Sequence, residues 1–247
     1  MSILCVISAR GGSVGVPGKN VRSLLGTPII ARAVNTALAA PEIESVLIST
    51  DSPAIAEAAR AAGAQVPFMR PAELAQSVTG KFQVWQHALA ACEGQNPARY
   101  ELYVDIDCTN PLLEASDISA AIAKFRRLRD TGVPVDAVFT VAKARRNPYF
   151  NLVEPDESGA LKMSKSRGGT VLARQSAPAV YEHVAGVYVL APAYLRRANH
   201  LLDGHAQGYE VPEDKAFDID SELDFDLIEF LLRRREQAAG SLAQTSR

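Results

Sequence analysis

Residues 3–20, ILCVISARGGSVGVPGKN, join a short apolar run to a glycine-rich, cationic turn. Four glycines interrupt this turn: Gly11, Gly12, Gly15 and Gly18. Glycines let backbone N–H groups face an anion, and Arg10 and Lys19 add full positive charge. The dinucleotide fingerprint and the Walker loop both fit poorly, because the glycines are misplaced and Gly18-Lys19 is followed by Asn20. We therefore predict a strand that leads into a phosphate-binding loop of another kind, with an ordinary strand–helix turn as the alternative.

The composition is that of a globular protein with a sizeable core. The 247 residues are 47% hydrophobic, and 26 Lys and Arg against 28 Asp and Glu give a formal charge of −2. This balance predicts no nucleic-acid or membrane partner, so any cationic site must be local. The three cysteines show no disulfide or zinc spacing, and no apolar run approaches the length of a membrane span. We expect a cytoplasmic protein.

Beyond the loop, helical and strand-like apolar patterns alternate. Helices are predicted over residues 28–40, 54–62, 81–93 and 115–129, and strands over residues 45–50, 65–68, 102–106, 137–141 and 186–190. This alternation predicts an α/β fold with a doubly wound, mostly parallel sheet. Ligands bind such sheets beyond the carboxyl ends of the strands, where Arg10, Asp51, Arg70 and Asp107 are expected to converge.

The pattern loosens between the last two predicted strands, which suggests a division of the chain. We expect a core of residues 1–142 and 186–235, an excursion over 143–185 and a flexible tail over 236–247. The excursion is basic, with Lys143, Arg145, Arg146, Lys162, Lys165, Arg167 and Arg174. It either faces an acidic ligand or is a solvated surface arm.

A second chemical feature is the acidic segment 217–226, FDIDSELDFD. On an extended chain Asp218 and Asp220 project to the same side, as a hard divalent cation such as phosphate-bound Mg²⁺ requires. Ser221 is expected to cap a helix over residues 222–235. Capping alone would explain the acidic residues inside the helix, but it leaves Asp218 and Asp220 outside, where they form a candidate metal site.

Together the loop and the acidic segment resemble the acylneuraminate cytidylyltransferase family, the CMP-sialic acid synthetases and their relatives. The family loop R-x-G-S-K-G-x-P-x-K-N is matched by Arg10, Gly12, Ser13, Gly15, Pro17, Lys19 and Asn20. STD at residues 49–51, RPAEL at 70–74 and FDIDSELD at 217–224 match three further elements. The resemblance spans most of the chain.

The resemblance implies a Rossmann-like nucleotidyltransferase in which the anomeric hydroxyl of a 2-keto-3-deoxy sugar acid attacks the α-phosphate of CTP and pyrophosphate leaves. It implies Lys19 and Arg10 as catalytic residues, and Mg²⁺ bound by Asp218 and Asp220. The nucleotide-binding residues it implies are Arg10, Gly11, Gly12, Ser13, Asn20 and Arg70. It also implies a homodimer in which the excursion reaches across to the partner.

The sequence departs from the family pattern at several positions. Val14 replaces the first lysine of the loop and removes one positive charge from the triphosphate site, so Lys19 must provide more of that charge. The family element Q-P-T-S-P-L-R is DCTNPLL here, over residues 107–113, and Ala185 stands where N-G-A-I-Y begins with asparagine. Phe150 stands where a substrate-binding lysine is expected. Most departures fall at positions where the family binds its sugar substrate. The acceptor-binding candidates are Asp107, Asn110, Phe150 and His183.

Several alternatives remain open on sequence alone. The protein could use another nucleoside triphosphate or sugar, or bind a nucleotide without turnover. Arg70 could form an ion pair at the end of a strand in place of a nucleotide contact, and His183 could be a structural histidine.

Overall fold

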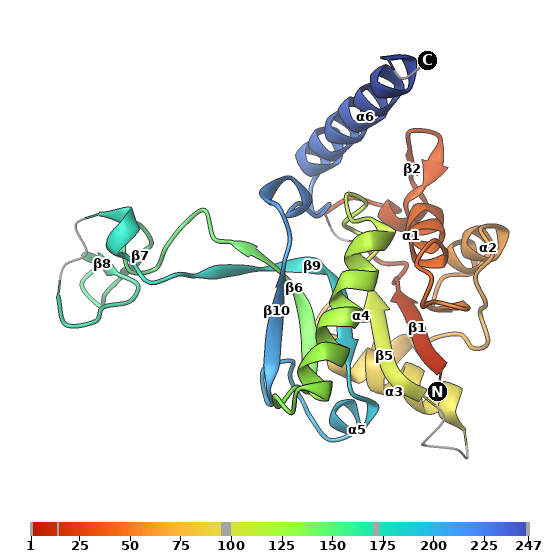
Figure 1. Ribbon diagram of the computed structural model, residues 1–247, viewed down its shortest axis with the longest axis horizontal. Coiled ribbons are helices and arrows are strands. Elements are labelled where there is room, and N and C mark those ends of the chain that lie inside the picture. Colours follow the sequence, from red (N-terminus) through yellow and green to blue (C-terminus); the bar gives the residue numbers. More distant parts are fainter. Residues whose placement is uncertain (1, 14, 95–99, 170–172, 246–247) are drawn as a thin grey trace.

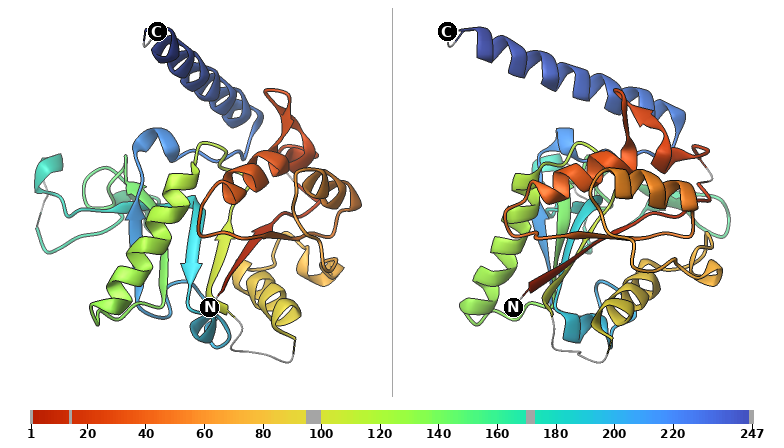
Figure 2. Two further views of the ribbon diagram at one scale, coloured as in Figure 1. Left: turned by 45° about the vertical axis from the view of Figure 1, so that its right-hand side comes forward. Right: turned by 90° about the vertical axis from the view of Figure 1, so that its right-hand side faces the viewer.

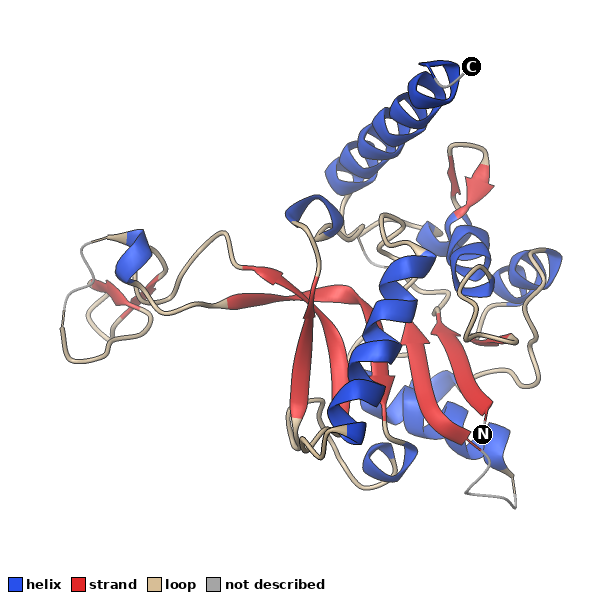
Figure 3. Ribbon diagram, in the orientation of Figure 1, coloured by secondary structure: helices blue, strands red, loops and turns tan. Residues whose placement is uncertain are grey.

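The computed structural model of the chain describes residues 2–13, 15–94, 100–169 and 173–245. Within these residues, a six-stranded sheet has the order β10-β6-β9-β5-β1-β4 (Figures 1 and 3). The strands are β1 Ser2–Ser8, β4 Val46–Ser49, β5 Tyr100–Ile106, β6 Ala137–Lys143, β9 Tyr181–Leu190 and β10 Ala206–Glu210. Pairing is parallel for β1 with β4 and β5 and for β6 with β10, whereas β9 runs antiparallel to β5 and β6. The predicted doubly wound, mostly parallel sheet is confirmed.

Helices cover both faces of this sheet (Figure 2). One face is covered by α1 Ile29–Leu38, α2 Pro53–Ala61 and α4 Ala115–Asp130, and the other by α3 Lys81–Glu93 and α5 Pro192–Leu195. Helix α6 Glu222–Thr245 projects away from the sheet (Figure 1). Short 3₁₀ helices are η1 Lys19–Val21, η2 Ala72–Leu74, η3 Arg174–Ser176 and η4 Glu213–Lys215. Two small hairpins pair β2 Ser23–Leu24 with β3 Thr27–Pro28, and β7 Val153–Pro155 with β8 Leu161–Met163.

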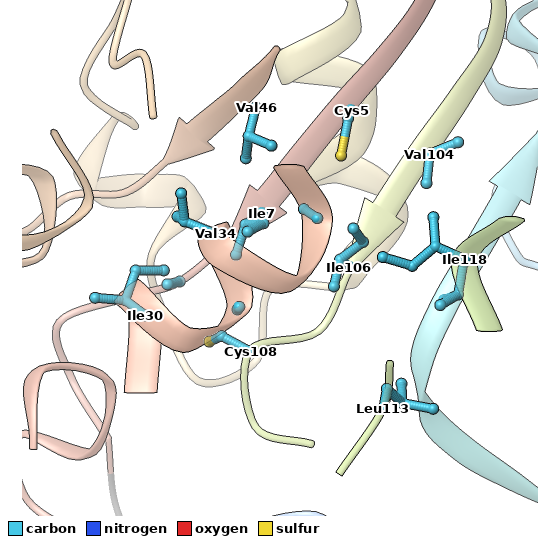
Figure 4. Packing of buried hydrophobic residues seen from close by; sticks show 14 of the residues in the cluster. Cys5, Ile7, Ile30, Val34, Val46, Val104, Ile106, Cys108, Leu113 and Ile118 are labelled. Carbon is cyan, nitrogen blue, oxygen red and sulfur yellow. The ribbon is translucent and has the colours of Figure 1, made fainter. Parts of the chain in front are cut away.

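The apolar run of β1 explains why both faces are covered. Side chains alternate along a strand, so Cys5 and Ile7 join the core beneath α1 and α4, whereas Leu4 and Val6 join the core beneath α3 and α5. All four are buried. Figure 4 shows the first of these cores, where Ile7 lies against Val34 of α1. A strand that is apolar on both faces needs cover on both of them, and β1 lies between β5 and the edge strand β4.

Strands β6 and β9 continue past the body of the sheet and carry the β7–β8 hairpin at their far end (Figures 1 and 3). We call residues 144–180, between these two strands, the arm. Ala144 donates its backbone N–H to Val180, which closes the base of the arm. The arm therefore projects from the core on a two-stranded stalk.

Several predicted boundaries need correction. The strand predicted over residues 65–68 is only an isolated bridge between Leu47 and Gln65, and β9 begins at Tyr181, five residues earlier than predicted. Sequence analysis missed the edge strand β10, whose sequence AQGYE lacks an apolar run. Helix α6 continues to Thr245, so residues 236–245 are helical where a flexible tail was predicted. Among the described residues, no helix combines the length and apolarity that crossing a membrane would require.

Candidate active site

The glycine-rich loop leaves the carboxyl end of β1, between those of β4 and β5, and is held there by its own polar groups. Asn20 donates a side-chain N–H to the carbonyl of Arg10 at 2.9 Å, which closes the loop on itself. Gly18 has a φ of 65°, in the left-handed region, and η1 begins at the next residue. The N–H of Gly11 is donated to Asp51 at 2.8 Å, so this predicted phosphate donor already has a carboxylate partner. Val14 lies outside the described residues.

The acidic segment lies against this loop. Ile219 donates its N–H to the carbonyl of Thr109 at 2.9 Å, which attaches the segment to the end of β5. The ammonium of Lys19 donates to the carbonyl of Ile219 and lies 3.4 Å from Oδ1 of Asp220. A Cβ added to Gly15 would lie 1.9 Å from the backbone oxygen of Asp220. The two sequence features that suggested a nucleotide site are therefore in direct contact.

The start of α6 holds the acidic segment in place. The Ser221 hydroxyl accepts the N–H of Asp224 at 3.3 Å, and the Asp224 carboxylate accepts the N–H of Ser221 at 2.8 Å. This reciprocal arrangement confirms Ser221 as the predicted cap. Arg22 then binds both oxygens of Glu222 and stacks 3.9 Å above the ring of Phe225, which ties α6 to the loop.

Asp218 and Asp220 are the candidate metal ligands. Burial raises the pKa of Asp218, and the neighbouring carboxylates of Asp220 and Asp107 raise it further. Such mutual repulsion is relieved by a divalent cation with oxygen ligands. Within the described part of the chain, no group of three or more His, Cys, Asp or Glu side chains is arranged to hold a metal. Among biological cations, Mg²⁺ is one that takes only one or two carboxylates and completes its shell with phosphate and water.

A cavity of about 210 Å³ opens between the loop, the ends of β1 and β5, and the start of α3. Six of the predicted site residues line it: Arg10, Ser13, Lys19, Asn20, Arg70 and Asp107. Lining residues that the sequence analysis did not select include Gln76, Thr79, Lys81 and Thr109. The convergence expected at the carboxyl ends of the strands is thus present for the loop, for the position after β5 and for Arg70.

Arg70 is a buried wall of this cavity. Its guanidinium donates through Nε to the hydroxyl of Ser49 at 3.0 Å and also donates to the Ser49 carbonyl. Burial lowers the pKa of Arg70, against the opposing influence of Asp105 and Asp51. Its hydrogen bonds are thus made to Ser49, and an ion pair is not needed to explain its position.

Asp107 is not the free carboxylate that the sequence suggested. Its Oδ2 forms an ion pair with Lys81, and its Oδ1 accepts the hydroxyl of Thr109 at 3.0 Å. Burial opposes ionisation, but Lys81 and Thr109 hold the pKa of Asp107 below its usual range. A local signal for Lys81 does exist in the sequence. It is a cation at the first position of a helix, where the helix dipole disfavours positive charge.

Beneath this pair lies a buried carboxyl group, that of Asp105. The residue is 1% exposed and accepts the hydroxyl of Ser8 at 2.8 Å. Burial, together with the nearby Asp107 and against the attraction of Lys81, raises the pKa of Asp105 to about 6.

Three predicted acceptor-binding residues lie elsewhere. Asn110 is buried, and its amide donates to the carbonyls of Ala185 and Lys215, so it holds the core together. His183 lies behind Tyr188, with its Nε2 3.1 Å from the Tyr188 hydroxyl. The arm, which carries Phe150, projects away from the body of the sheet (Figure 1), and Phe150 is not among the described residues that line the cavity.

The chain was compared with families of known proteins. A family model described as cytidylyltransferase matches residues 4–245. The chain belongs to the cytidylyltransferase family. This confirms the resemblance drawn from the sequence motifs, and the protein is an enzyme of this family.

Among the relatives of this cytidylyltransferase, the post-translational flagellin modification protein B of Campylobacter coli is 35% identical over 237 residues, covering 96% of this chain and 97% of the relative. The CMP-N,N'-diacetyllegionaminic acid synthase of Campylobacter jejuni is 38% identical over 230 residues, covering 93% and 94%. A solved CMP:2-keto-3-deoxy-manno-octonic acid synthetase complexed with CTP has a TM-score of 0.67 at 16% identity and covers 95% of this chain and 100% of its own. That structural likeness supports the Rossmann-like fold.

The contact at Gly15 yields a first prediction. Gly15→Ala places a Cβ against the backbone of Asp220, so the loop must move away from the acidic segment. We expect CTP binding to weaken by about tenfold or more, since displaced site groups commonly cost 10²-fold in function. The measurement is the CTP concentration that gives half-maximal thermal stabilisation. Gly169→Ala, where an added Cβ meets nothing within 4 Å, is the control. Unchanged CTP binding in Gly15→Ala would contradict the role of this contact.

Asp105 leads to a prediction about how thermal stability depends on pH. Its folded-state pKa of about 6 exceeds the ordinary value of 3.8, so the folded protein is stabilised by protonation at low pH and loses that contribution as pH rises through about 6. Asp105→Asn keeps the oxygen that accepts the Ser8 hydroxyl but does not ionise. The melting temperature of Asp105→Asn minus that of wild type should therefore increase from pH 4.5 to pH 7, as measured by thermal denaturation. A difference independent of pH would show that Asp105 does not titrate in this window.

Proposed function

We propose that this protein transfers CMP from CTP to the anomeric hydroxyl of a sialic-acid-like 2-keto-3-deoxy sugar acid and releases pyrophosphate. The observation that carries the proposal is the contact between the glycine-rich loop and the acidic segment. It places the ammonium of Lys19 beside the carboxylate of Asp220, in the segment that also carries Asp218, although the two are about 200 residues apart in sequence.

The transfer of CMP depends on stabilisation of negative charge in the transition state and needs no covalent intermediate with the protein. The acceptor oxygen bonds to the α-phosphorus, the bond from that phosphorus to the bridging oxygen breaks, and the hydroxyl proton passes to solvent. Negative charge then grows on the α-phosphate and on the leaving pyrophosphate. Lys19, which is 12% exposed at the cavity wall, and Arg10 supply positive charge there.

Mg²⁺ is the proposed cofactor, held by Asp218 and Asp220. When bound, it would neutralise phosphate oxygens and the two carboxylates together. Lys19, whose ammonium lies 3.4 Å from the Asp220 carboxylate, is a cation beside this site.

The names of the relatives support a nine-carbon or related sugar acid as acceptor. The 38% identical relative is a CMP-N,N'-diacetyllegionaminic acid synthase, whereas the pseudaminic acid and N-acylneuraminate cytidylyltransferases are 26% and 24% identical. We therefore place N,N'-diacetyllegionaminic acid first in an acceptor panel that also contains pseudaminic, N-acetylneuraminic and 3-deoxy-manno-octulosonic acids.

The test measures pyrophosphate release with CTP, Mg²⁺ and each acid of this panel. Lys19→Ala should lower kcat by about 100-fold to 1,000-fold, the usual cost of removing one charge-stabilising donor. Asp218→Asn should raise the Mg²⁺ concentration needed for half-maximal rate. Lys143→Ala removes an exposed lysine that pairs with Glu210 and serves as control. Full activity in Lys19→Ala would refute the assignment. CTP-induced stabilisation without pyrophosphate from any acceptor would instead indicate binding without turnover, and parallel tests with GTP, UTP and ATP address the nucleotide.

We further propose a homodimer formed through the arm. In the β7–β8 hairpin, Val153 pairs with Met163 and Pro155 with Leu161, so these four side chains share one face. Val153, Leu161 and Met163 are exposed, at 50%, 69% and 40%. An exposed apolar face on a projecting stalk is suited to a second copy of the chain, whose arm could carry Phe150 towards the partner's cavity.

Replacing this apolar face should change the oligomeric state. We expect Val153→Glu with Leu161→Glu to convert a dimer into a monomer, because two carboxylates would be buried at the interface. The molar mass in solution, measured by light scattering after size exclusion, reports the outcome. Lys162→Glu, on the opposite face of the same hairpin, should leave the mass unchanged. A monomeric wild-type protein, or a doubly substituted protein that stays dimeric, would exclude an interface at this hairpin face.

A further inference from the structure

Lys81 occupies a position that local helix energetics do not explain. It is the first residue of α3 and follows Gly80, which makes no side-chain cap. A cation at this end of a helix opposes the dipole and the unpaired N–H groups of the first turn. Contacts outside the helix must therefore stabilise it.

Those contacts come from two neighbouring strands. The ammonium of Lys81 forms its ion pair with Oδ2 of Asp107, directly after β5. It also lies 3.4 Å from the hydroxyl of Tyr188 on β9 and 4.4 Å from the centre of that ring. Burial raises the pKa of Tyr188 to about 12, so its hydroxyl stays neutral and Asp107 balances the lysine charge.

Lys81 nevertheless remains open to the cavity. Its side chain is 44% exposed, and it lines the cavity together with Arg10 and Lys19. An ammonium has three donors, of which Asp107 and the Tyr188 hydroxyl can take two. At least one N–H is then available to a ligand that enters from the cavity.

The charge of this pair indicates what kind of group it can bind. On the loop side, the carboxylate near Lys19 is that of Asp220, 3.4 Å away and 78% exposed, whereas the Asp107 carboxylate paired with Lys81 is only 12% exposed, so Lys19 is better placed for phosphates. At Lys81 a carboxylate or phosphate ligand would meet the negative charge of Asp107. An uncharged group that both accepts and donates hydrogen bonds, namely a hydroxyl or an acylamino group, fits an ammonium beside a carboxylate.

We propose that Lys81 is an acceptor-binding residue, and that Lys81 and Asp107 together bind an uncharged hydroxyl or acylamino substituent of the sugar acid. This inference rests on the proposed transfer to a sugar acid. It gives Asp107 the role of ion-pair partner to Lys81. Lys81 and Asp107 would then also determine the specificity for the acceptor sugar acid.

The test compares Lys81→Met, Asp107→Asn and the double variant with wild type. Acceptor KM is measured at saturating CTP and CTP KM at saturating acceptor, using the best acid of the panel. We expect Lys81→Met to raise acceptor KM by about tenfold or more, because it leaves Asp107 unpaired and removes a charged hydrogen bond. CTP KM should change by less than about twofold, and the double variant should recover part of the loss, since it also removes the unpaired carboxylate.

A merely structural role for Lys81 would give a different pattern. It would lower the melting temperature and raise both KM values together, or leave both unchanged, and either result overturns the proposal. Lys143→Met, which removes an equally long side chain from an exposed ion pair, is the matched control. Should Lys81→Met fail to fold, Lys81→Arg retains the charge with altered geometry. The proposal then requires a rise in acceptor KM alone.

A binding measurement separates this inference from the proposed reaction. Acceptor-induced stabilisation is recorded by thermal shift for wild type and Lys81→Met in the presence of CTP. Stabilisation that Lys81→Met abolishes, without pyrophosphate release from wild type, would refute the transfer and support the Lys81 site. Pyrophosphate release with equal acceptor KM in both proteins would support the transfer and overturn the Lys81 site. Neither stabilisation nor turnover with any acid of the panel would overturn both.

Discussion

The close approach of the glycine-rich loop to the acidic segment organises the functional end of this protein. Gly15 leaves no room for a side chain against the Asp220 backbone, and Lys19 donates to the carbonyl of Ile219 next to it. The contact depends in turn on the sheet, because β1 delivers the loop and the residues after β5 bind the segment through Thr109. Helix α6 begins from the same segment, and the bond between Arg22 and Glu222 secures it to the loop.

Charge pairing is the second constraint on the site. Lys19 faces Asp220 and Lys81 faces Asp107, so the crevice gathers cations within a chain of slightly negative net charge. Each pair reduces the cost of holding like charges close together before a ligand arrives.

The predicted acceptor-binding residues lie in different parts of the molecule. Asp107 lies at the cavity, whereas Phe150 is carried away on the stalk formed by β6 and β9. Asn110 has a structural role, because its amide donates hydrogen bonds to two backbone carbonyls in the core. Leu113, which stands in place of a family arginine, is likewise buried, and it packs where Gly186 leaves room.

The sequence by itself determined the fold class and the identity of the two main motifs, because apolar periodicity, glycine placement and the cap at Ser221 are local properties. It could not determine the end of α6 or the edge strand β10, since neither carries a strong local pattern. Only the tertiary structure paired Asp107 with Lys81, because their proximity depends on how α3 packs beside β5. Local sequence sets which groups can carry charge, and long-range packing decides which charges meet.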